Sequence, residues 1–250
     1  MSLVFAGSGH KYLSSAISLA TGSSTPFSFV VWTKLASLTN PRWFSAYYST
    51  YAPRVMALGS GIGEGAIAIH SGGGIDYAVS DALTTGSWFC VVGRYDPAVP
   101  TAKAKVSGGT EATNGSIPVW SNVGLETLEL GAYSPEGGSL DGKIAHLALF
   151  HNYYLTDGDV TAALAGDSPM TLGSTPTHYW PARTSADTLA SWAGTSALTL
   201  AQTGTGTDVA WDGGDNPTVD DPPSGVEEAL NGSALTGGHG TASPVFAIGL

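Results

Sequence analysis

Glu126 and Glu129 are the two carboxylates of this sequence whose spacing comes nearest to that of a glycoside hydrolase. Such hydrolysis needs two carboxyl groups that flank the scissile bond, one as the acid and one as the nucleophile or base. The segment around them reads as a β-strand, in which residues three apart point to opposite faces. The two glutamates therefore cannot act as a local pair, although carboxylates distant in sequence could still meet in space.

Other residues that could do catalysis also lack the required spacing. No two of the six histidines stand four residues apart, and His146 and His151 fall on opposite faces of a strand, so we expect ordinary polar or capping histidines. Cys90 lies in the apolar run 88–92, which favours a buried core residue over a nucleophile. A G-x-S-x-G motif and a phosphate-binding loop are both missing from the sequence. We therefore expect a protein that is not an enzyme.

Four aspartates near the end of the chain could suggest calcium, which binds carboxylate and carbonyl oxygens. Their spacing matches no EF-hand loop, and a solvated acidic linker explains the same residues. We therefore expect no cofactor, because no recognisable site supports calcium. The four residues are Asp212, Asp215, Asp220 and Asp221.

An aromatic cluster within nine residues is the best candidate for a ligand-binding surface. Exposed rings could stack on the faces of sugars, and strand alternation would place Trp43 and Tyr47 on one side and Phe44 and Tyr48 on the other. The alternative is that these rings belong to the core, since alternation buries half of them. The candidate ligand-binding residues are Trp43, Tyr47, Tyr48 and Tyr51.

Charge and composition exclude several classes of function. The 250 residues carry a formal net charge of −11, whereas binding to nucleic acid needs clustered lysine and arginine. After Arg183 the chain has eight acids and no base. A single cysteine excludes a disulfide framework. No segment reaches 18 apolar residues, and the N-terminus lacks the pattern of a signal peptide, so we expect no membrane partner and synthesis in a cytoplasm.

The elements that must position these residues are mostly short strands, in a chain with 34 glycines and few strong helix formers. One helix is expected, because Thr156 to Asp159 has the form of a capping box and Gly166 follows an apolar stripe. We expect this helix to pack on a sheet end. The strand candidates are 26–36, 43–48, 54–58, 66–70, 75–79, 88–95, 102–106, 127–131, 143–151, 177–180, 197–201 and 208–211.

The composition changes after residue 212. Residues 213–226 are rich in Gly, Pro and Asp and read as an acidic linker, and residues 227–250 form a tail of small and apolar residues. The tail ends in an apolar strand pattern that either pairs with another chain by β-augmentation or folds back on its own domain. The candidate partner-binding residues are Val245, Phe246, Ile248 and Leu250.

A series of motifs resembles the laminin-G-like jelly-roll domains of the concanavalin A-like superfamily. The central strand 86–96 (GSWFCVVGRYD) is similar to the tryptophan strand that ends in Tyr-Asp in that family, and 27–33 (FSFVVWT) resembles the strand before it. Further matches in order are 128–131 (LELG), 140–150 (LDGKIAHLALF), 154–156 (YLT) and the helix from Val160 to Leu164, while 179–181 (YWP) with 191–194 (SWAG) resembles the opening of such domains.

The resemblance implies an all-β fold of two antiparallel sheets with jelly-roll connections, covering residues 1–212. Alternation supports it, because Leu147 and Leu149 share a face opposite His146 and Phe150, as in a sandwich with one core face and one polar face. Two departures argue against a conventional calcium site. Ala145 and His146 stand where the family often has acids, and the hairpin at 106–109 (VSGG) lacks the usual asparagine.

The resemblance and the tail together predict a structural or binding protein. The leading hypothesis is a phage virion accessory protein, such as a capsid decoration or head or tail surface protein. It would be made in the host cytoplasm, display a lectin-like domain on the virion surface and attach through its tail. Its partners would be other virion proteins, such as the major capsid protein, in a homo-oligomer. The alternative is a carbohydrate-binding module for a cell-surface or extracellular glycan.

Overall fold

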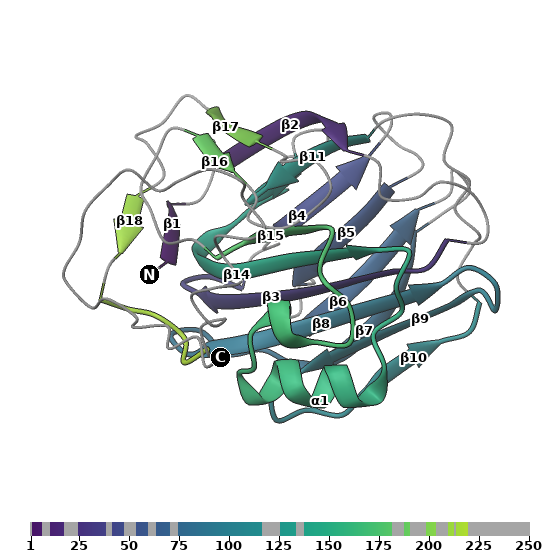
Figure 1. Ribbon diagram of the computed structural model, residues 1–250. Coiled ribbons are helices and arrows are strands. Elements are labelled where there is room, and N and C mark those ends of the chain that lie inside the picture. The colour runs from purple at the N-terminus through teal and green to yellow at the C-terminus, as the bar shows by residue number, and fades with distance from the viewer. Residues whose placement is uncertain are drawn as a thin grey trace, which may run out of the picture.

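The computed structural model is a sandwich of two antiparallel sheets with one helix outside it (Figure 1). This architecture confirms the predicted all-β jelly-roll class with one short helix. The predicted C-terminal tail lies outside the residues that the structure describes. Those residues are 2–6, 11–17, 25–38, 42–47, 54–59, 64–70, 75–116, 126–133, 138–181, 188–190, 199–203, 210–212 and 214–219.

Sheet A lies between the helix and the second sheet (Figure 1). Its central strands come from distant parts of the chain, since β3 lies between β8 and β14. The described strands run in the order β10 (Ala112–Asn114), β9 (Thr101–Val106), β8 (Trp88–Asp96), β3 (Phe27–Leu35), β14 (Asp141–His151), β1 (Ser2–Ala6) and β18 (Ala210–Asp212), with β15 (His178–Trp180) also paired to β14.

Sheet B forms the other layer of the sandwich. Its described strands run in the order β16 (Thr188–Ala190), β17 (Thr199–Thr203), β2 (Lys11–Ile17), β11 (Glu126–Leu130), β4 (Arg42–Tyr47), β5 (Arg54–Gly59), β6 (Glu64–His70) and β7 (Ile75–Ala82). A short hairpin of β12 (Ala132–Tyr133) and β13 (Gly138–Ser139) stands apart from both sheets.

The core between the sheets is built from alternate residues of facing strands. Phe29 of β3 meets Phe44 of β4 edge-on, with ring centroids 5.1 Å apart, and Leu128 and Leu130 of β11 join the same cluster. Each such buried side chain contributes about 2 kcal/mol. Gly93 of β8 is the cross-strand partner of Phe29, and a Cβ at this position would overlap the phenyl ring. Glycine is therefore required where the ring crosses β8.

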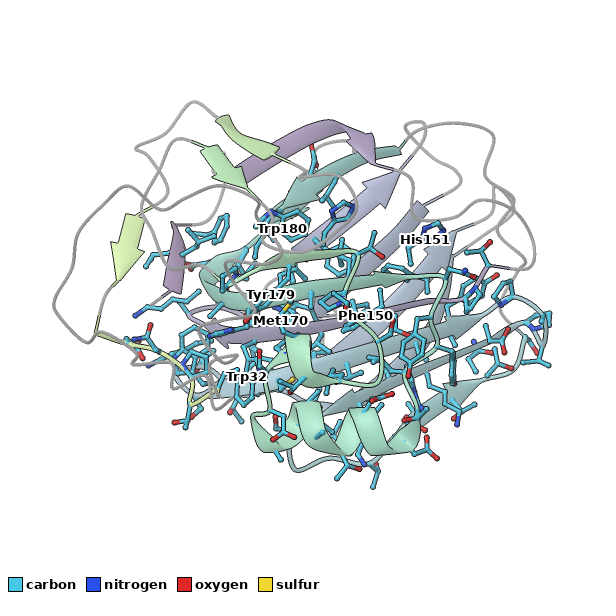
Figure 2. The ribbon with its side chains drawn as sticks, in the orientation of Figure 1. Trp32, Phe150, His151, Met170, Tyr179 and Trp180 are labelled. Carbon is cyan, nitrogen blue, oxygen red and sulfur yellow. The ribbon has the colours of Figure 1, made fainter. Side chains whose placement is uncertain are left out.

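Sheet A is buried on its second face as well, which corrects the expectation of one polar face. Trp32, Cys90 and Phe150 of sheet A form an outer cluster with Val160 and other residues of α1 (Asp157–Ala165). The 3₁₀ turn η2 (Pro169–Thr171) adds Met170, and Figure 2 shows Trp32, Phe150, Met170 and Tyr179 of this cluster. The helix thus lies on the face of sheet A and not, as expected, on a sheet end. Cys90 is a buried core residue, as predicted.

Shifts of register interrupt the alternation of several described strands, and two of them lie in β4 and β14. In β4 the register with β5 shifts between Arg42 and Phe44, and both Trp43 and Phe44 are buried. In β14 the register with β3 shifts between Ala145 and Ala148, and His146 takes a positive φ of 50°. A bulge adds one residue to a strand and re-aims the side chains beside it. Among the described residues no helix is long and apolar enough to cross a bilayer.

Candidate functional site

Trp43 belongs to the core and is not an exposed sugar-stacking residue. Its side chain is 0% exposed and packs edge-on against Phe89, with ring centroids 6.3 Å apart. The prediction for Trp43 is wrong because strand alternation was assumed through a segment that contains the β4 bulge. Tyr48 and Tyr51, the other two candidates after Tyr47, lie outside the described residues, as do Val245, Phe246, Ile248 and Leu250 of the tail.

Tyr47, at the end of β4, stands in a row of cross-strand partners on sheet B. Its Cα partners are Thr127 of β11 and Arg54 of β5, and Arg54 pairs in turn with His70 of β6. The next row contains Leu128, which lies in the core between the sheets. Because successive rows of a sheet alternate between its faces, the positions of Tyr47, Arg54 and His70 lie on the outer face of sheet B. We call these three positions the outer row.

Glu129, one of the two glutamates that come nearest to a glycosidase pair, is enclosed by the fold. Glu129 is only 1% exposed and has an interaction partner within the fold, while its neighbours Leu128 and Leu130 lie in the core, as alternation predicts. A carboxylate so enclosed is not open to a substrate from solvent. Within the described ranges, no group of three or more His, Cys, Asp or Glu side chains is arranged to hold a metal ion.

Residues 214–219, which we call the strap, pack on the sandwich. Pro217 is buried, Val219 packs against the outer cluster, and the carbonyl oxygen of Thr218 lies against Gly166 at the end of α1. This differs from the expected solvated linker, which was to begin at residue 213. The remainder of that linker, from residue 220 onward, is outside the described part of the chain.

Asp215 fixes the strap through three donors from three strands of sheet A. Lys34 Nζ lies 2.9 Å and Lys143 Nζ 2.5 Å from Asp215 Oδ2, and Trp88 Nε1 donates to Oδ1 at 2.9 Å. We call Lys34, Trp88 and Lys143 the carboxylate cradle. The hydrogen bonds from Lys143, Lys34 and Trp88 hold the pKa of Asp215 far below its usual range. Asp215 is therefore an ion-pair partner of two lysines in this structure.

The cradle was missed because its members are distant in sequence, although one local signal pointed to it. Lys34 and Lys143 each stand in a mostly buried strand of sheet A, Phe27–Leu35 and Asp141–His151. A lysine in such a strand needs either an exit to solvent or an anion beside it. The sequence does not say which acid supplies that anion, since Asp215 is 72 residues from Lys143 and 181 from Lys34.

Two histidines, His146 and His178, are buried and pack against aromatic side chains. His178 stacks on Trp180 with ring centroids 5.7 Å apart, and burial, together with the nearby His151, lowers its pKa to about 4. His146, at the β14 bulge, lies with Nδ1 2.6 Å from the hydroxyl of Tyr179. His146 and His178 are thus packed inside the domain, and the expectation of ordinary polar histidines overlooked how deeply they are buried.

Comparison with known proteins shows the fold. No model of a known protein family matches the sequence, and no curated protein matches it. Among solved structures, a SAP-like pentraxin from Limulus polyphemus covers 82% of this chain and 94% of its own, with a TM-score of 0.56 and 12% identity. The CBM40 of the Ruminococcus gnavus IT-sialidase, solved with α2,6-sialyllactose, covers 66% of this chain and 97% of its own, with a TM-score of 0.53 and 15% identity.

Both structures are concanavalin A-like jelly rolls, so the fold implied by the motif series is confirmed. The match to the pentraxin covers most of both chains, and the match to the CBM40 covers nearly all of that module. At these identities the likeness concerns the fold, and the function has to be argued from the surfaces of this chain.

Proposed function

We propose that this chain is a carbohydrate-binding module that acts by binding and not by catalysis. The observation that carries the proposal is the outer row on sheet B, and the fold shared over 97% of a module solved with a bound sialyllactose agrees with it. Sugar recognition needs a surface that offers an aromatic ring for stacking together with hydrogen-bonding groups. The outer row supplies these residue types, with a tyrosine, an arginine and a histidine at adjacent cross-strand positions.

The two faces of the sandwich differ in a way that favours sheet B as the binding face. The outer face of sheet A is packed under α1, η2 and the strap. Its aromatic side chains Trp32, Phe150 and Tyr179 are buried there and cannot reach a ligand in solvent. The outer row lies on the other sheet, away from the helix. Glu129 stands on the same face of β11, two residues beyond Thr127, and is only 1% exposed, so the proposed surface is the part of this face at the outer row and not at Glu129.

A glycan array probed with the purified full chain tests this proposal. We expect binding to a defined set of glycans, and we expect Tyr47→Ala to weaken it by about two- to tenfold, since stacking on a ring contributes about 0.5–1.5 kcal/mol. Val99→Ala is the matched control, because Val99 is an exposed apolar residue, 61% accessible, on the hairpin between β8 and β9. The absence of glycan binding, or equal binding by wild type and Tyr47→Ala, contradicts the proposal.

A second candidate is the virion accessory role, in which the tail attaches the domain to a particle and the glycan-binding domain is displayed. The strap supports it, because Asp215, Pro217 and Val219 tie the chain to sheet A just before the residues of the tail. A partner that holds the tail would therefore also hold the domain. We expect truncation at Pro223, which keeps the strap, to leave a folded domain that no longer sediments with particles. A truncated chain that still decorates particles contradicts the role of the tail.

A further inference from the structure

The register of sheet A places two lysines directly opposite each other. Lys34 of β3 is the Cα partner of Lys143 of β14 and, on its other side, of Trp88 of β8. The two lysine side chains are only 27% and 19% exposed. Like charges that face each other across a ladder are destabilising, and partial burial strengthens the repulsion. This row therefore needs an anion to offset the repulsion between the two lysines. The register of sheet A creates that need, whether or not the strap is bound.

The structure shows which kind of anion the row accepts. The carboxylate of Asp215 receives both ammonium groups on one oxygen and the indole N–H of Trp88 on the other. The charge-assisted bonds supply attraction, and the indole fixes the plane of the carboxylate. We propose that Lys34, Trp88 and Lys143 form a binding site for an organic carboxylate, which the chain's own Asp215 occupies in this structure.

A cavity of about 410 Å³ beside the cradle gives room for the body of such a ligand. Lys34 and Lys143 line it together with the apolar residues Val4, Phe5 and Leu35. This volume lies within the usual range for small-molecule sites, roughly 300–1,000 Å³. Asp141 also lines the cavity, so a second acid on the ligand would be repelled. The site therefore fits a compound with one carboxylate on an apolar body.

Asp215 acts as an internal competitor for this ligand. Because it belongs to the same chain, its effective concentration at the cradle is high, on the order of millimolar or above. Its strongly depressed pKa keeps it ionised at ordinary pH, so protonation does not open the site. The strap must instead be displaced by a competing carboxylate. This inference does not depend on glycan binding by sheet B.

The test is an NMR titration of the full chain that follows the indole N–H signal of Trp88. The probes are benzoate, its neutral counterpart benzamide, acetate and chloride. With Asp215→Asn, benzoate is expected to shift the Trp88 signal in a saturable way, with a dissociation constant about tenfold or more below that of wild type. Acetate binds more weakly than benzoate because it leaves the cavity empty, and benzamide and chloride do not reproduce the shift.

Two further variants make the result specific. Asp96→Asn removes one acid from the last position of β8, where its carboxylate accepts from the backbone N–H of Ala98, and is expected to behave as wild type. Lys143→Met added to Asp215→Asn is expected to abolish the benzoate shift. The proposal is overturned if Asp215→Asn shows no saturable shift, if benzamide or chloride matches benzoate, or if the double variant still binds. Should Asp215→Asn fail to fold, excess benzoate on wild type decides, since displacement of Asp215 must move the same signal.

Discussion

Arg94 of β8 ties helix α1 to sheet A through a buried guanidinium. The side chain is 2% exposed, and its Nη1 donates to the carbonyl of Leu155 and to Asp157, both at 2.8 Å. Its Nη2 pairs with Glu111, and the ring of Tyr154 lies 5.0 Å from Cζ. A charge taken this far out of water is tolerated only with such partners, so this one residue fixes the chain segment that enters the helix.

Arg94→Met is expected to lower the free energy of unfolding by about 3 kcal/mol, because it leaves the carbonyl of Leu155 and the carboxylate of Asp157 without their donor and leaves Glu111 with Lys103 alone. Lys103→Met is the matched control, since Lys103 also pairs with Glu111, at 3.2 Å, but through a side chain 29% exposed. It should cost less than about 1 kcal/mol. Chemical denaturation measures both values, and equal losses in the two variants contradict the buried role of Arg94.

His178 gives the domain a specific sensitivity to acid. Its pKa is lowered from 6.5 to about 4 by burial and by the charge of His151, so the folded state prefers the neutral ring. The contribution of His178 to the free energy of unfolding is therefore fully present above pH 6.5. It is lost as the pH falls from 6.5 to 4, and it does not change further below pH 4. The loss amounts to about 3 kcal/mol.

We therefore expect His178→Asn to flatten the dependence of unfolding free energy on pH between 6.5 and 4. Urea denaturation at several pH values compares it with wild type. Carboxylates whose pKa is lowered by folding, such as Asp159, change the unfolding free energy only at lower pH. They are present in both wild type and His178→Asn. Parallel curves for the two proteins across this window show that His178 is not the titrating group.

Among the elements, α1 shows how local signals specify structure. Thr156 Oγ1 accepts from the backbone N–H of Asp159 at 3.1 Å, and Asp159 Oδ2 accepts from the N–H of Thr156 at 2.8 Å. Gly166 ends the helix with φ of 107°. The capping box and the glycine lie within one short segment, so the sequence alone predicts both ends of the helix.

Removal of the cap is expected to have a measurable but local effect. Thr156→Ala loses the bond to Asp159 and should lower the free energy of unfolding by about 1 kcal/mol. Thr161→Ala in the same helix is the control, because its exposed hydroxyl only bonds back to the carbonyl of Asp157, and it should be neutral within about 0.5 kcal/mol. A control as destabilised as Thr156→Ala in thermal or chemical unfolding contradicts the capping role.

Other elements could not be predicted from local sequence. The β4 bulge turned Trp43 inward because register depends on pairing with β5, which no spacing within β4 reveals. The local sequence of the strap is that of a solvated linker. Its packing depends on Lys34 and Lys143, which are distant in sequence and lie beside it only in the folded protein. Ser2–Ala6 and Lys11–Ile17 were not predicted as strands, since the first has only five residues and the second mixes apolar with small and polar residues.

For the whole molecule, the order of motifs was more informative than any one of them. The tryptophan strand, the following strands and the helix predict a jelly roll, and the sandwich confirms it. The second buried face of sheet A was missed because Ala148 and Phe150 were assigned to a polar face. The cover that a helix and the strap form over a sheet is a tertiary feature, which local sequence does not reveal. The fold shows that α1 covers the outer face of sheet A and not that of sheet B (Figure 1).

The most direct measurement of the central claim is a map of backbone NMR shifts on addition of a glycan selected by the array. If sheet B is the binding face, the largest changes should fall on Tyr47, Arg54 and His70 and their neighbours in β4, β5 and β6. The signals of α1 and of the cradle residues should stay in place. Changes centred on α1 or η2, or no saturable change anywhere, contradict the account of this chain as a glycan-binding jelly roll.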